Sequence, residues 1–159
     1  MGHILVAYFS ATGTTAKAAN CLTESIGADI YEIEPAAPYT ADDLNWGDKT
    51  SRTSLERSDP AMRPAINGRR DNMDDYATVF VGIPIWWYSA PRIINTFLES
   101  YDLSGKMVIP FATSEESGMD GICGSIAHSC PGAELKEGRR ISENCSLQEL
   151  SDWATNSML

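Results

Sequence analysis

Hydroxylated residues surround one glycine immediately after the first apolar segment of the chain. The segment ILVAYF spans residues 4–9 and predicts a strand buried on both faces, and an alanine-rich helical pattern follows the loop. A helix that starts here presents free backbone amides, which favour an anion, and Gly13 permits close backbone approach. We interpret this stretch as a phosphate-binding loop, with a plain Ser/Thr helix cap as the alternative. The loop residues are Ser10, Ala11, Thr12, Gly13, Thr14 and Thr15.

Other phosphate-binding motifs fit this loop poorly. A P-loop requires G-x-x-x-x-G-K-[ST], and the dinucleotide fingerprint requires three spaced glycines, whereas residues 10–15 contain one glycine and no charged residue. The nearest cation is Lys17, two residues further along the predicted helix. The loop therefore predicts a phosphate held by amides and hydroxyls, and neither a nucleoside triphosphate nor NAD in its usual pose.

Three consecutive aromatic residues follow a second buried strand, predicted at 77–83. Side chains at adjacent positions cannot all face one core, so at least one should face outward, where it could stack on a flat ligand. Packing inside the core is the alternative. A phosphate beside a flat ring, without a ribose-recognising acid, indicates flavin mononucleotide (FMN). The segment begins with Pro84, Ile85, Trp86, Trp87 and Tyr88.

The remaining pattern predicts one α/β domain, residues 1–159, with a parallel sheet covered by helices on both faces. Residues 34–73 hold four prolines and predict a loop with one or two short helices. Ligands of such sheets bind beyond the carboxyl ends of the strands, which here selects residues 10–15, 84–91 and 113–121. Strands are expected at 4–9, 29–33, 77–83, 106–112 and, as one short strand, within 133–141. Helices are expected at 16–26, near 40–46 and 52–58, at 91–100, at 120–129 and after the capping box at 146–149, with Leu147, Leu150, Trp153 and Ala154 facing inward.

These segments together resemble the flavodoxin family. S-A-T-G-T-T after ILVAYF is similar to the flavodoxin phosphate loop, S/T-x-T-G-x-T, and VFVGIPIWWYSAPRIINTFLES resembles the ring-binding segment of bacterial flavodoxin-like proteins. The resemblance extends to YTADDLNWGDKTSR and to the helix after residue 146. It implies a flavodoxin-like three-layer sandwich, with a five-stranded parallel sheet in the order 2-1-3-4-5 known for flavodoxins and FMN at its carboxyl edge.

The resemblance also implies roles for individual residues. The phosphate would be held by Ser10, Thr12, Gly13, Thr14 and Thr15, and the isoalloxazine would be lined by Pro84, Ile85, Trp86, Trp87 and Tyr88. Thr113 and Ser114, with Ser117 and Gly118 nearby, would reach the pyrimidine edge or the ribityl chain. This third loop departs from the family pattern, because TSEESG stands where relatives often carry glycine and serine.

Composition excludes several other classes of function. The formal net charge of −10 disfavours nucleic-acid binding. The sequence contains no apolar run of 18 residues and no basic leader at its start, so we expect a cytoplasmic protein with no membrane partner. Cys21, Cys123, Cys130 and Cys145 include no C-x-x-C pair, which argues against zinc and for small buried or half-buried thiols. No side chain is assigned a catalytic or metal-binding role.

Three functional classes remain open at this stage. The first is a low-potential electron carrier whose redox partners have basic docking surfaces. The second is an FMN-dependent NAD(P)H reductase of quinones or similar acceptors, although the sequence contains no nicotinamide fingerprint. The third is a non-redox module that binds a phosphate ligand. A further hypothesis is that Trp46 and Ser51–Arg52 fold over the flavin and gate access to it. The oligomeric state stays undetermined.

Overall fold

The computed structural model describes residues 3–11, 13–45, 47–84, 90–113, 119–141 and 146–159. Its strands are β1 (His3–Tyr8), β2 (Asp29–Glu32), β3 (Tyr76–Ile83), β4 (Met107–Ala112), β5 (Glu134–Leu135) and β6 (Arg139–Arg140). Its helices are α1 (Thr14–Ile26), α2 (Arg52–Ser58), α3 (Arg92–Glu99), α4 (Asp120–Ile126) and α5 (Leu147–Ser157), with single 3₁₀ turns at Met73–Asp75 and Ala127–Ser129. Within these residues no helix is long and apolar enough to cross a membrane.

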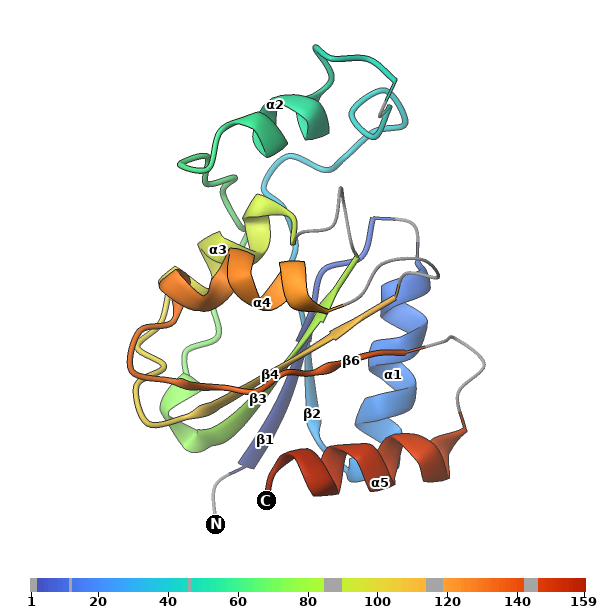
Figure 1. Ribbon diagram of the computed structural model, residues 1–159, viewed down its shortest axis with the longest axis vertical. Coiled ribbons are helices and arrows are strands. Elements are labelled where there is room, and N and C mark those ends of the chain that lie inside the picture. The colour runs from blue at the N-terminus through green and yellow to red at the C-terminus, as the bar shows by residue number, and fades with distance from the viewer. Residues whose placement is uncertain (1–2, 12, 46, 85–89, 114–118, 142–145) are drawn as a thin grey trace.

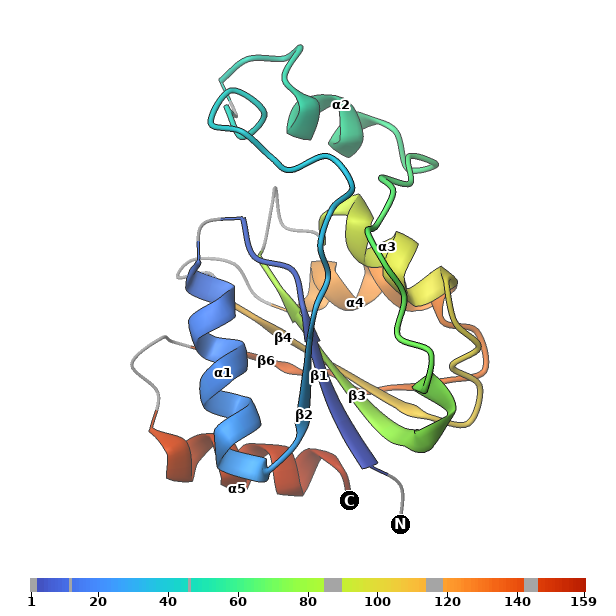
Figure 2. The same cartoon turned by 180° about the vertical axis from the view of Figure 1, so that it is seen from behind.

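The strands form one parallel sheet in the order β2-β1-β3-β4-β5, which confirms the predicted topology. Helices α1 and α5 cover one face and α3 and α4 cover the other, so the molecule has three layers (Figures 1 and 2). Because strand order reverses between β1 and β3, the loops that follow these two strands diverge to opposite faces. That divergence is the geometry that places a ligand between them.

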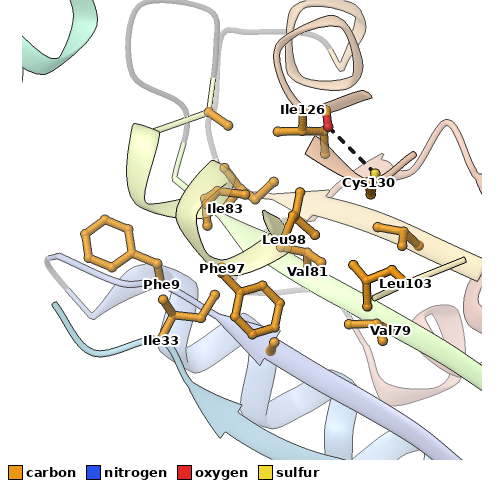
Figure 3. Close-up of a cluster of buried hydrophobic side chains, with 14 of the residues drawn as sticks. Phe9, Ile33, Val79, Val81, Ile83, Phe97, Leu98, Leu103, Ile126 and Cys130 are labelled. Carbon is orange, nitrogen blue, oxygen red and sulfur yellow. Dashed lines mark hydrogen bonds between the residues drawn. The ribbon is translucent and has the colours of Figure 1, made fainter. Parts of the chain in front are cut away.

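Alternate residues of β3 build the two halves of the core. Val79, Val81 and Ile83 point toward α3, where they pack with Phe97 and Leu98 (Figure 3). Phe80, between them, points to the other face and belongs to the cluster formed with α1 and α5. All of these side chains are buried. A strand covered on both faces therefore needs the continuous apolar run seen in the sequence.

The fifth position of the sheet holds two short strands instead of one. Both β5 and β6 pair with β4, and residues 136–138, which end at Gly138, separate them. The carbonyls of Val108 and Ala112 accept hydrogen bonds from the amides of Lys136 and Ile141. Pro110 lies between Val108 and Ala112 and has no N–H to donate. A Cβ at Gly138 would overlap the carbonyl oxygen of Pro110, and its φ of +78° favours glycine. The single short strand predicted within 133–141 is thus interrupted where proline meets glycine.

Two smaller predictions differ from the structure. Residues 41–44 form turns where a short helix near 40–46 was considered, although α2 matches the one predicted at 52–58. Leu147 is 44% exposed, so its predicted inward position is wrong. The whole first turn of α5 is exposed, and burial begins at Leu150.

Residues 34–72, which we call the arm, leave the sheet after β2 and carry α2. An antiparallel bridge between Pro35 and Ile66 closes its base. In both views the part of the arm that carries α2 projects beyond the carboxyl edge of the sheet, on the side of α3 (Figures 1 and 2). The chain then runs back past α3 to the start of β3, so α2 is the part of the arm that lies near the predicted ligand-binding edge.

Candidate functional site

Three loops start level with one another at the carboxyl edge of the sheet. The amide of Phe9 donates to the carbonyl of Gly82 at 3.1 Å, and the amide of Thr113 donates to the carbonyl of Ile83 at 3.3 Å. These two bonds continue the hydrogen bonding between neighbouring strands one residue past the ends of β1 and β4. The first, second and third predicted loops consequently begin side by side, as the strand order requires.

The first loop enters α1 through a glycine in the left-handed region. Gly13 is the N-cap with φ of +96°, and its amide donates to Ser10 Oγ at 3.0 Å. The first helical bond runs from the amide of Lys17 to the carbonyl of Gly13, so the amides of Thr14, Thr15 and Ala16 lie ahead of it at the helix end. The first turn contains no acidic residue. This donor set suits a phosphate.

A pair of hydroxyls joins the first loop to the third. Thr15 Oγ1 and Thr113 Oγ1 lie 2.7 Å apart, and Thr15 is only 2% exposed. In such a pair one hydroxyl donates to the other, which leaves one hydrogen for a further acceptor. Thr15 and Thr113 were assigned to different parts of the ligand, and the structure brings them together.

The second loop is described only at its ends. Pro84 is half-buried at the end of β3, and Ala90 is buried immediately before α3. The amide of Ala90 donates to Ser125 Oγ at 3.2 Å, and that hydroxyl in turn donates to the carbonyl of Ile122. The ring-binding segment, residues 84–91, is thereby fastened to α4, the helix that follows the third loop.

Several predicted residues lie outside the described part of the chain. For the three loops these are Thr12, Ile85, Trp86, Trp87, Tyr88, Ser114, Ser117 and Gly118, and for the gating hypothesis Trp46. Their assignments stay predictions. Of the predicted ligand contacts, the structure describes seven, which follow the ends of β1, β3 and β4 or begin α1: Ser10, Ala11, Gly13, Thr14, Thr15, Pro84 and Thr113.

The arm is anchored beside the first loop through a buried carboxylate. Tyr39 packs against Phe9 with ring centroids 5.5 Å apart, and its hydroxyl donates to Glu56 Oε1 at 2.5 Å. Arg52 Nε donates to the other oxygen of Glu56 at 2.9 Å, and its guanidinium lies 3.7 Å from the Tyr39 ring centroid. Burial, together with the hydrogen bond to Glu56, raises the pKa of Tyr39. Arg52 therefore serves the arm itself, and Ser51 is the buried N-cap of α2.

Two contacts at this edge escaped the sequence reasoning. Ser125 lies in a helix that carries no motif, and Tyr39 opens the segment YTADDLNWGDKTSR, whose resemblance to the family assigned it no contact. Their partners, Ala90 and Glu56, are 35 and 17 residues away in the sequence. No local pattern signals a pairing over such a distance.

Comparisons with known proteins identify the family to which this fold belongs. The flavodoxin family model matches residues 3–157. The chain belongs to the flavodoxin family. No curated protein matches it.

Solved structures of flavodoxin-like proteins cover the whole length of the chain. A Bacteroides eggerthii protein described as a flavoprotein is 44% identical, with coverage of 100% and 99% of the two chains and a TM-score of 0.92. A similarly described Bacteroides uniformis protein is 47% identical, with coverage of 97% and 98% and a TM-score of 0.90. A Lactobacillus acidophilus flavoprotein solved with FMN is 21% identical, covers 97% and 99%, and has a TM-score of 0.73. The last similarity concerns the fold alone.

Proposed function

We propose that this flavodoxin binds FMN and carries electrons at low potential between redox proteins of the cytoplasm. The observation that carries the proposal is the first turn of α1. The turn that begins at Gly13 offers backbone amides and threonine hydroxyls, and it contains no acidic residue that would repel an anion. Family membership supports FMN as the ligand. Free thiols at Cys21 and Cys130 suit a reducing compartment.

In this proposal the protein binds and orients the cofactor, and FMN when bound supplies the redox chemistry. Ser10 and the amides at the start of α1 hold the phosphate, with Thr15 adding a hydroxyl fixed by Thr113. Pro84 and the segment after it line the ring. Among the described residues no cluster of histidine, cysteine or carboxylate side chains could hold a metal ion. In this proposal the chain acts by positioning the cofactor and by its electrostatic field.

Comparison of FMN with riboflavin tests the phosphate loop directly. The two ligands share the isoalloxazine and ribityl chain, and only FMN carries the phosphate. Two or more charge-assisted hydrogen bonds to the phosphate should make FMN bind about 100-fold more tightly than riboflavin. Quenching of flavin fluorescence measures both dissociation constants. Equal affinity, or binding of neither ligand, would contradict the proposed site.

The redox role is tested by reduction with and without a partner. The net charge of −10 supports partners whose docking surfaces are basic, and their association should slow as salt is added. We expect the FMN-loaded protein to accept electrons from a basic flavodoxin reductase plus NADPH, and to oxidise NADPH slowly alone. Rapid oxidation of NADPH without a partner would instead identify the reductase of quinones or similar acceptors.

A further inference from the structure

An exposed bend, Asn67–Gly68, follows the bridge that closes the base of the arm. Both residues are exposed, and Gly68 has φ of +78°. This is also the one place in the sequence where glycine directly follows asparagine. The side-chain carbonyl of an asparagine is electrophilic, and a glycine places beside it a backbone nitrogen that no Cβ shields.

The polar groups of the bend are free to rotate. Within the parts of the chain that the structure describes, neither the Asn67 carboxamide nor the Gly68 amide has a hydrogen-bond partner. A Cβ at Gly68 would meet no atom within 4 Å. A cavity of about 160 Å³ lies beside the bend, lined by Gly68 and Arg69 of the arm and by Thr96 and Phe97 of α3. The bend therefore has room to change its backbone and side-chain angles.

Three other asparagines show what is particular to Asn67. Asn72 is also exposed, but Met73 follows it, and the side chain of Met73 crowds the next backbone nitrogen. Asn20 and Asn95 lie within α1 and α3, where the helix holds the following amide and the carboxamides donate hydrogen bonds. Asn67 combines exposure, a following glycine and an unbonded carboxamide.

We propose that Asn67 is a site of spontaneous deamidation, with the backbone nitrogen of Gly68 as the nucleophile. This nitrogen loses its proton to hydroxide and forms a bond to Cγ of Asn67. The bond from Cγ to the carboxamide nitrogen breaks, and ammonia leaves after taking up a proton from water. Water then opens the resulting five-membered succinimide at either carbonyl. Position 67 becomes aspartate, or isoaspartate when the main chain runs through the former side chain.

The isoaspartate product lengthens the main chain between two fixed points. The Asn67 amide donates to the carbonyl of Glu34 at 2.8 Å, and the Arg70 amide donates to the Tyr101 hydroxyl at 2.8 Å. An extra backbone carbon between these bonds changes the spacing of the two amides, and hydrogen bonds weaken steeply outside a narrow range of length and angle. Deamidation therefore loosens the returning part of the arm and adds one negative charge there.

Mass spectrometry of the full-length protein during incubation at mildly alkaline pH tests the site. Asn67 should convert at least about tenfold faster than Asn72, the internal control, and in proportion to hydroxide concentration. Enzymatic methylation of isoaspartyl carboxylates measures the isoaspartate product. Asn67→Gln should stay unmodified at position 67, because its ring closure would need six members. Conversion of Asn67 no faster than that of Asn72, or conversion only after unfolding in urea, overturns the proposal.

Hydrogen exchange of the incubated protein tests the effect on the arm. The amides of Asn67 and Arg70 should exchange at least about fivefold faster than in fresh protein, whereas the amides of α1 should be unchanged. Fresh Asn67→Asp carries the added charge without the extra backbone carbon, and incubated Asn67→Gln carries neither, so both should exchange like fresh wild-type protein. Deamidated protein whose arm amides exchange at the original rate would overturn the loosening.

Discussion

The phosphate loop and the arm leave adjacent strands at the same edge of the sheet, yet they are held in different ways. Residues 10–15 are fixed mainly by neighbours in the sequence: Gly13 bonds to Ser10, and the helix begins at once. The arm is fixed by side chains that reach distant segments. Arg63 binds both oxygens of Glu99, 36 residues away, and Arg69 donates to the carbonyl of Ser100.

The phosphate loop is therefore held by its own backbone geometry, whereas the arm is held by contacts with distant residues. Backbone geometry at a helix start is decided within a few residues, so the phosphate loop should keep its form in isolation from the arm. The arm is decided by several arginine contacts, each of modest strength when partly exposed. Changes in the loop should therefore alter affinity for FMN directly, whereas changes in the arm should act first on local order.

The largest effect is expected when the carboxylate of Glu56 is removed. Glu56 is 6% exposed and bonded to Tyr39 and Arg52, so Glu56→Ala removes the acceptor that these two side chains share. We expect the local stability of α2 to fall by about 2–3 kcal/mol. Hydrogen exchange of the α2 amides measures this loss. Glu24→Ala, at an exposed site on α1, is the control and should change stability by less than about 0.5 kcal/mol.

The next largest effect is expected when alanine replaces either of the glycines at the two ends of α1. Gly13 and Gly27 have φ of +96° and +64°, and a Cβ at either would meet no atom within 4 Å. Alanine at each should cost about 1–2 kcal/mol of backbone strain. Gly13→Ala should also raise the FMN dissociation constant about tenfold, because the loop is displaced where phosphate binds. Gly27→Ala should lower thermal stability and leave the FMN dissociation constant unchanged. If Gly27→Ala weakened FMN binding as much as Gly13→Ala, the effect of Gly13 on FMN would not be local to the phosphate loop.

A smaller effect is expected from breaking the bond between the first and third loops. Thr113→Val removes one member of the hydroxyl pair and leaves buried Thr15 without that partner, at a cost of about 1 kcal/mol. The FMN dissociation constant should rise about fivefold in a fluorescence titration. Thr23→Val, which removes a hydroxyl bonded within α1, should leave FMN affinity unchanged. An unchanged dissociation constant in Thr113→Val would show that the pair does not position the phosphate loop.

The smallest effect concerns the ion pair that holds the returning end of the arm. The side chains of Arg63 and Glu99 are 27% and 39% exposed, so Arg63→Gln should cost less than about 1 kcal/mol. Hydrogen bonds from Arg63 and then Ser129 lower the pKa of Glu99 below its ordinary value of 4.5.

The pH dependence of this ion pair follows from the direction of that pKa shift. The pair stabilises the folded state above pH 4.5, and the contribution is lost as pH falls through the lowered value. Urea unfolding between pH 6 and about pH 3 should show a shallower loss of stability in Arg63→Gln than in the wild-type protein. Parallel curves for the two proteins would contradict this assignment.

Strong local patterns predicted most of the fold. Continuous apolar runs gave the positions of β1, β3 and β4 to within about two residues, and the capping box placed α5. The split fifth strand was missed because its cause, a contact between Gly138 and Pro110, joins residues from two strands. Leu147 was placed inward because helical periodicity does not show where a neighbouring surface ends.

In the candidate site, too, local features were predicted from the sequence and contacts between distant residues were not. Helix-start chemistry is local, so the types and order of residues 10–15 sufficed to predict a helix start led by Gly13 and free of acidic residues, and phosphate binding there stays a prediction. Three contacts could be found only in the fold: the bond between Thr15 and Thr113, the bond from the Ala90 amide to Ser125, and the bond from the Arg92 guanidinium to the carbonyl of Glu56. In each, the partners are between 35 and 98 residues apart.

The sequence by itself determined the parallel α/β sheet, the buried strands and a glycine-led turn suited to an anion. It could do so because strand burial, helix capping and positive φ depend on runs of a few residues. Tertiary structure alone decided which side chains fasten the three loops and the arm to one another. Those contacts form only after the sheet has brought distant residues within hydrogen-bond reach, since hydrogen bonds act over about 3 Å whatever the separation along the chain.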